Sequence, residues 1–298
     1  MPPPETPART KPQSAWKLAG LSVRQLAGNV FRDVTAHNFF GRASELAFDF
    51  LFALFPLLLF MLTLIGLFTS GSAELQGDLL AFFSDFLPRT AFALLNTTAM
   101  ELASHASNGK LTAGILFALW FASGGVSSMI SALNLAYGAK EERSWLRVRA
   151  IALCLTLLIS ALLLAALLLV LVSGHAADWL GIKLGLTPEV VALWKALQWP
   201  AAIAFVILSH ALIYYFGPHL ENRRWRWVTP GSVFGVVLWL AASLGLRIYL
   251  HFFNSYSTTY GSLGAVMILL VWLYVTGFAF LVGGEINAEI ERAAARAV

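Results

Sequence analysis

The sequence predicts an all-α polytopic membrane protein, a bundle of six transmembrane helices accompanied by amphipathic interfacial helices. Hydrophobic residues make up 58% of its 298 residues and charged residues only 12%, against a charged share of roughly 25% in soluble domains. The apolar residues also fall into long blocks, and a bilayer core of about 30 Å needs about 20 apolar residues in a helix. A third observation, the placing of basic residues between these blocks, gives the topology.

Six blocks are long enough to cross a bilayer, and together they predict a transmembrane domain over residues 46–290. The first block contains Pro56, which lacks an amide hydrogen and crowds the preceding turn, so we expect its helix to kink there. Cys154 lies inside the third block and, as the single cysteine, has no partner for a disulfide. The predicted spans are 46–68, 111–133, 150–172, 197–216, 228–250 and 263–282.

Lysine and arginine residues are unevenly divided between the two sides of these spans. Fifteen of the 20 fall on the side that carries both chain ends, in four groups separated by pairs of spans. Basic residues accumulate on the cytoplasmic side of membrane proteins, so both termini are expected in the cytoplasm. Contact with anionic lipid headgroups accounts for the basic groups, and no nucleic-acid partner is expected because they lack interleaved aromatic residues on a soluble module. The other five are Arg89, Lys110, Lys183, Lys195 and Arg247.

Residues 15–45 are expected to form a cytoplasmic amphipathic helix region before the first span. Leu18, Leu26, Val30 and Val34 recur near one helical face of this region, and basic residues occupy the others. Two placements fit this pattern. The helix lies on the inner leaflet of the membrane, or it packs beneath the bundle.

Three further segments lie outside the predicted spans. Residues 1–14 are expected to be a disordered tail, and residues 291–298 a cytoplasmic tail. Residues 70–109 are expected to be an external helical segment, divided at Pro88. The acidic residues of this segment form a solvated helix face or a contact for a periplasmic partner.

Polar residues gather at the inner ends of three predicted spans. Ionisable groups inside apolar helices are costly to desolvate, so they usually face a bundle interior or water and mark a functional hypothesis. Either they build a site for a proton or cation, or they are interfacial carboxylates paired with nearby arginines. The candidate inner polar rim consists of Asp49, Asn134, Tyr137, Glu285, Asn287 and Glu289.

A second polar group lies at the outer end of the fifth span. Residues 251–262 form either a loop that re-enters a water-filled cavity or an ordinary polar loop, beside which Arg247 reaches the outer headgroups. The candidate outer polar rim consists of Arg247, His251, Asn254, Tyr256 and Tyr260. No catalytic, cofactor-binding or metal-binding residues are expected, because the carboxylates lack an adjacent nucleophile and His210 has no second histidine at ligand spacing.

Several short motifs follow one another in a characteristic order. They are LFP at 54–56, ALNLAYG at 132–138, PG at 230–231, YGSLGAV at 260–266, WLY at 272–274 and GGEINAE at 283–289. This ordered set resembles the YihY/BrkB family of bacterial inner-membrane proteins, from about residue 39 to residue 288. At Ala47, Phe48 and Asp49 the chain lacks the second aromatic residue of many relatives, so the family implies no role for Asp49.

The resemblance implies a protein of the bacterial inner membrane that is linked to envelope integrity and virulence, with transport as its activity and no defined substrate. Relatives have also carried a ribonuclease label, against which we expect no enzyme here, because the chain has no clustered histidine and aspartate ligands and no soluble catalytic domain. We therefore expect a transporter or flippase for a lipid or small amphipathic solute, in contact with membrane lipids. The alternative is a non-transporting scaffold or partner-binding protein of the cell envelope, and neither reading fixes the oligomeric state.

Overall fold

The computed structural model describes residues 15–68, 97, 110–184, 187–220, 228–252 and 262–296. Its elements within these residues are all helical, so the all-α prediction is confirmed for them. A short 3-10 helix, η1 (Ala15–Gly20), precedes the α-helices. These are α1 (Val23–Ala36), α2 (Phe39–Phe68), α5 (Lys110–Ala136), α6 (Trp145–Leu184), α7 (Pro188–Phe216), α8 (Pro230–Phe252) and α10 (Ser262–Arg296).

Five of the described helices, α5, α6, α7, α8 and α10, are long and apolar enough to cross a membrane. The chain is therefore a multi-pass membrane protein. The first predicted span lies in α2, where no side chain beyond Leu57 is described, so the count of six spans stays a prediction. The helix α2 continues through Pro56, which therefore does not end it. The predicted kink at this proline stays a prediction too.

Several helices extend beyond the predicted spans. Helix α6 runs on to Leu184, and α7 already begins at Pro188, whose fixed backbone angle suits the first position of a helix. Helix α10 continues to Arg296, because the alanine, glutamate and arginine residues after Ile290 are strong helix formers. Residues 291–296 are therefore part of the last helix. The apolar windows of the sequence predict where lipid is crossed, and helix formation extends beyond these windows.

Helix α1 packs against the bundle through one apolar stripe. The side chain of Ser22 caps its first turn, and Gln25 completes the reciprocal capping box. Leu26, Val30 and Val34, one turn apart, are buried in the same apolar cluster as residues of α2, α5 and α10. This helix therefore packs against the bundle, and neither of the two placements expected for it is excluded. Its position relative to lipid stays a prediction.

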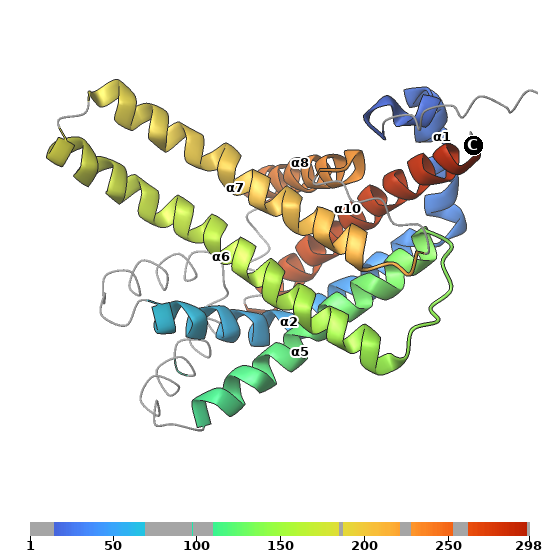
Figure 1. Ribbon diagram of the computed structural model, residues 1–298, viewed down its shortest axis with the longest axis horizontal. Helices are drawn as coiled ribbons and strands as arrows, with labels where there is room; N and C mark the ends of the chain where they lie inside the picture. Colours follow the sequence, from blue (N-terminus) through green and yellow to red (C-terminus); the bar gives the residue numbers. More distant parts are fainter. Residues whose placement is uncertain are drawn as a thin grey trace, which may run out of the picture.

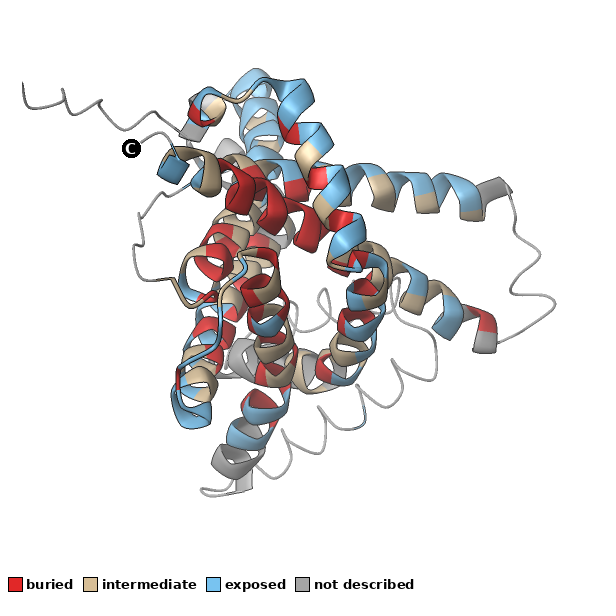
Figure 2. Cartoon of the chain, turned by 90° about the vertical axis from the view of Figure 1, so that its right-hand side faces the viewer, coloured by how far each residue is buried: buried red, intermediate tan, exposed pale blue. Residues whose placement is uncertain are grey.

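Among the described residues, those at one end of the bundle are buried much more fully than those of α7 and α8 at the other end. Every residue from Ala279 to Ile290 of α10 is buried, and Figure 2 shows this stretch as a long buried run leading to the end of the chain. By contrast, no residue of α8 from Val237 to Leu250 is buried, and none of α7 from Pro188 to Leu208. Figure 1 shows α2, α5 and the α6–α7 pair diverging on the side away from α1.

The crossing of α8 and α10 is built on glycine. A Cβ atom added to Gly231 would lie 2.0 Å from the carbonyl oxygen of Gly283, and one added to Gly283 would lie 2.6 Å from that of Gly231. Small residues allow such close approach, which replaces the hydrophobic driving force that membrane helices lack in lipid. The close contact holds the start of α8 against the buried half of α10.

Candidate functional site

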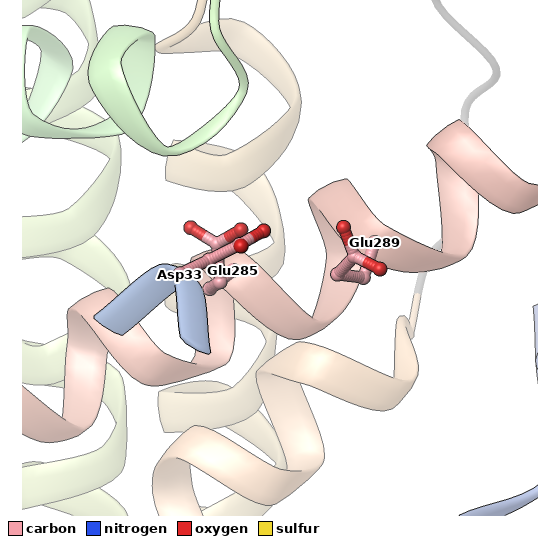
Figure 3. A group of neighbouring side chains, drawn as sticks. All are labelled: Asp33, Glu285 and Glu289. Carbon is pink, nitrogen blue, oxygen red and sulfur yellow. The ribbon is translucent and has the colours of Figure 1, made fainter. Parts of the chain in front are cut away.

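Three carboxylates meet where α1 lies against the last turns of α10. Asp33 comes from α1, and Glu285 and Glu289 stand one turn apart on α10; one oxygen atom of each lies within 4.8 Å of the others. We call these three residues the acidic cluster. Figure 3 shows the carboxylates of Asp33 and Glu285 side by side, with Glu289 further along α10. Glu285 and Glu289 are buried, and Asp33 is half-buried, so their charges are only partly screened by water.

One arginine neutralises part of this charge. The Nη2 atom of Arg292 lies 3.1 Å from Oδ2 of Asp33 and 2.8 Å from Oε1 of Glu289, and it also contacts Oε1 of Glu285. A guanidinium is always charged in proteins. Carboxylate oxygens are the ligands that hard cations prefer, but in this cluster a side-chain nitrogen takes the place that a cation would fill.

Two residues of the first helix region complete the contact with α10. Asn29 donates a hydrogen bond from Nδ2 to Oε2 of Glu289, at 2.8 Å. His37 follows two turns later, and its Nδ1 lies 3.5 Å from Oε2 of Glu285. Together with Asp33, these residues form a polar stripe at four-residue spacing, beside the apolar stripe of α1. Each residue of the polar stripe therefore contacts a charged side chain of α10.

Tyr137 stands just after α5, beside the acidic cluster. Burial raises the pKa of its hydroxyl group well above the ordinary value of 10.0, and the negative charges of Glu291 and Glu285 raise it further. The phenol therefore remains protonated and can donate a hydrogen bond. Arg292 also reaches this helix end, with Nη1 3.4 Å from the carbonyl oxygen of Ala136.

Asn134 belongs to a separate network that joins the ends of α5 and α7. Its Nδ2 donates to Glu141 at 2.7 Å, and its Oδ1 accepts from the backbone amide of His219 at 2.7 Å. Arg143 is almost fully buried and binds Glu141 through two nitrogen atoms, at 2.7 and 2.6 Å. Its Nη2 also donates to the carbonyl oxygen of Gly217, at 2.7 Å. The network fixes the turn between α5 and α6.

Glu141→Gln is expected to destabilise the protein at neutral pH. Arg143 lowers the pKa of Glu141 from 4.5 to about 2, mainly through its side-chain hydrogen bonds. The stabilisation is therefore present above the unfolded pKa and is lost as the pH falls towards 2. We expect a loss of about 1 kcal/mol, because solvent screens this partly exposed pair. Thermal unfolding in detergent measures it, with the exposed Glu142→Gln as control; equal midpoints for the two variants at pH 7 would contradict the network.

Asn287 also stands apart from the acidic cluster. Its Oδ1 accepts a hydrogen bond from the backbone amide of Gly231 at 2.9 Å, and its Nδ2 donates to Oγ1 of Thr229 at 2.9 Å. Residues two apart point to different sides of a helix, so Asn287 cannot face the same way as its neighbours Glu285 and Glu289. It fastens α8 to α10.

The predicted inner rim is thus divided among several places. Glu285 and Glu289 lie in the acidic cluster with Tyr137 beside them, and the two asparagines hold helix ends. Asp49 is half-buried on α2 and is not among the residues that pair within the cluster. Both interpretations of the rim therefore remain open. Pairing with an arginine is observed, as the interfacial reading expects, and three carboxylates share one arginine, which leaves negative charge that a proton or cation could neutralise.

The outer rim is only partly within the described residues. Arg247 is exposed on α8, as snorkelling to the headgroups requires. His251 lies in α8, but its side chain is not described; Asn254, Tyr256 and Tyr260, with the predicted re-entrant loop, lie outside the described residues. His210, on α7, has its Nδ1 atom 3.0 Å from the carbonyl oxygen of Val206.

Sequence reasoning missed four residues of the cluster and its surroundings, namely Asn29, Asp33, His37 and Arg292. The first three share one helical face, and this spacing was a usable signal. The sequence pattern places Arg292 in the cytoplasmic tail, as one of the fifteen basic residues that indicate the topology. What links it to Asp33 is a contact between residues 259 positions apart, which no local pattern reveals.

Comparison with known proteins gives the family. The family model described as Virulence factor BrkB matches residues 30–297. The ribonuclease-like protein YfkH of Bacillus subtilis (strain 168) is 31% identical over 263 residues, which are 88% of this chain and 94% of YfkH. A UPF0761 membrane protein of Pseudoalteromonas atlantica (strain T6c / ATCC BAA-1087) is 28% identical over 92% of this chain and 87% of its own length.

A third relative is longer than this chain. The UPF0761 membrane protein Smlt0865 of Stenotrophomonas maltophilia (strain K279a) is 29% identical over 84% of this chain, which spans only 57% of that protein. No solved structure matches the chain. The region matched by the family model holds the whole acidic cluster together with His37 and Arg292. The chain belongs to the Virulence factor BrkB family.

Proposed function

We propose that the protein is a transporter or flippase of the bacterial inner membrane that moves a lipid or a small amphipathic solute and so supports envelope integrity. It crosses the membrane six times, and both termini lie in the cytoplasm. The uneven packing of the bundle is the observation that carries the proposal. The end of the bundle that holds the acidic cluster is closed by buried side chains. The opposite halves of α7 and α8 contain no buried residue.

The exposed halves of α7 and α8 carry large apolar side chains. On α7, Leu193 and Leu197 are 59% and 56% exposed, and on α8, Val237 and Leu244 are 56% and 58% exposed. Exposed apolar surface of this kind contacts lipid tails or an amphipathic solute. Tight packing at the end that holds the acidic cluster, with exposed apolar side chains on the opposite halves of α7 and α8, fits one state of an alternating-access cycle.

The acidic cluster supports the proposal from the closed end. Ionisable groups buried in membrane helices are costly, and they recur along ion pathways and proton relays. Ion pairs between α1 and α10 can be broken and remade when the closed end opens, whereas an apolar contact alone offers no such control. We propose no catalysis. The name of YfkH describes that protein alone. In this chain, Arg292 lies among the carboxylates that would have to hold a metal ion for the hydrolysis of a phosphodiester.

Liposomes that contain the purified protein test the proposal. Fluorescent phospholipids in the inner leaflet become accessible to an external quencher only if they cross the bilayer, and proton-coupled uptake of amphipathic solutes is measured in parallel. We expect rates above those of empty liposomes, and a several-fold change for Glu285→Gln. Glu45→Gln is the matched control, since Glu45 is exposed and pairs with Arg42 within α2.

A lack of flux for every lipid and solute tested would support the alternative, a non-transporting scaffold of the cell envelope. In that case the cluster serves only to hold α1 on the bundle. Cells that carry Glu285→Gln would then show an envelope defect only as far as the protein loses stability.

A further inference from the structure

Two buried polar atoms face each other across the contact between α1 and α10, and neither has a hydrogen-bond partner among the described residues. They are Oε2 of Glu285 and Nδ1 of His37. The distance between them is 3.5 Å, and the side chains are 0% and 26% exposed, respectively. Unsatisfied buried atoms cost free energy, and a pair of acceptors this close is satisfied when one proton lies between them.

The charges around this pair also require a proton. Asp33 faces it from α1, and Glu289 and Arg292 face it from α10. Tyr137, at the end of α5, lies near both Glu285 and the exposed Glu291. Arg32 pairs with Asp33 at 3.1 Å but is 69% exposed, so solvent screens its charge. Among the buried groups, the carboxylates of the acidic cluster therefore outnumber the single guanidinium of Arg292. The cluster carries excess negative charge until it takes up a proton.

We propose that His37 and Glu285 together bind one proton, and that this proton closes α1 onto the end of α10. The bound proton belongs to the pair, as imidazolium and carboxylate or as imidazole and carboxylic acid, and either form gives the same charge. The proton makes the third contact between the polar stripe and α10. The other two are the contacts of Asn29 with Glu289 and of Asp33 with Arg292. We call the stripe together with its partners on α10 the latch.

The direction of the pH dependence follows from proton counting. When α1 is released, both groups face water and need no shared proton, whereas in the closed latch one proton between them satisfies both buried atoms. The closed state is therefore favoured at low pH and is lost as the pH rises. This inference goes beyond the proposed transport, because the latch closes or opens whether or not a solute is moved. In a transporter it would make opening of the cytoplasmic end depend on protons.

Spin-label distances in lipid nanodiscs test the latch. In a Cys154→Ala background, Ala27→Cys on α1 and Ala295→Cys on α10 place labels at exposed positions. We expect one short distance at about pH 5 and a longer, broader distribution at about pH 9, a range that covers imidazole and raised carboxyl titrations. Glu285→Gln should keep the short distance throughout, because the neutral amide replaces the protonated acid. Glu45→Gln should respond as the unaltered protein does.

A second variant and a second measurement guard against misfolding of Glu285→Gln. His37→Phe should move the transition to lower pH, since the carboxyl group then holds the proton alone. The rate of maleimide labelling at Val34→Cys, which faces the core, relative to Ala27→Cys should rise as the pH rises. A distance distribution in the unaltered protein that does not change with pH, or an unaltered pH response in Glu285→Gln, would overturn the inference. Neither result depends on flux, so the proposed function stands or falls separately.

Discussion

Arg292→Gln is expected to lower the free energy of unfolding by about 3 kcal/mol, because it removes the cation that three carboxylates share. Breaking a buried ion pair by deleting one partner typically costs about 3–5 kcal/mol. The lower end applies here, since the side chain of Arg292 is 29% exposed and water relieves part of the repulsion. Thermal unfolding in detergent and protease sensitivity of α1 measure the effect. We expect α1 to be cut faster in the variant than in the unaltered protein.

Two further variants make this result specific. Arg296→Gln removes an exposed arginine from the same helix and should leave stability within about 0.5 kcal/mol, as is usual for surface substitutions. Arg292→Lys should restore part of the loss, because all three ion pairs involve the single nitrogen Nη2 and an ammonium has three donors. If Arg292→Gln were no less stable than Arg296→Gln, the cluster would not depend on its arginine.

Much of the fold could be predicted because lipid imposes a simple requirement. Long apolar blocks must be helices where they cross a bilayer, and the described helices contain five of the six predicted spans, whereas the span 228–250 begins two residues before α8. Glu285 and Glu289 could be singled out for the same reason, since polar residues at the end of an apolar helix are conspicuous. The ends of α6, α7 and α10 could not be placed, because helix formation outside lipid follows capping and propensity rather than hydropathy.

The partners that α1 provides for Glu285 and Glu289 could not be predicted, because they depend on long-range packing. Asn29 and Glu289 are 260 residues apart, and their contact depends on how α1 turns back against the bundle. At that turn Asn38 adopts a positive φ of 50°, a conformation that asparagine tolerates better than most residues. Sequence reasoning groups Asn134 and Asn287 with the carboxylates because all of them lie at the same ends of their helices. A position along a helix does not fix the direction in which the side chain points.

Gly231→Ala is expected to be nearly as damaging as the loss of Arg292, although it adds a single methyl group. The added Cβ would lie 2.0 Å from the carbonyl oxygen of Gly283 and 2.6 Å from the side chain of Asn287. The first of these is backbone, so α8 and α10 must move apart and the hydrogen bond from the amide of Gly231 to Asn287 is strained. Overpacking typically costs about 1–3 kcal/mol, and we expect the upper end.

Gly245→Ala in the same helix is the matched control for Gly231→Ala, because a Cβ atom there meets nothing within 4 Å. Alanine is the better helix former, so this variant should be unchanged or more stable by up to about 1 kcal/mol. The difference between the two midpoints of thermal unfolding therefore isolates the helix crossing from helix propensity. Equal midpoints would mean that α8 and α10 do not touch at Gly231, and Asn287 would then lose its role in joining them. A large difference would show that the end of the bundle that holds the acidic cluster is closed by direct backbone contact between α8 and α10. That contact is the rigid base against which α1 is proposed to move.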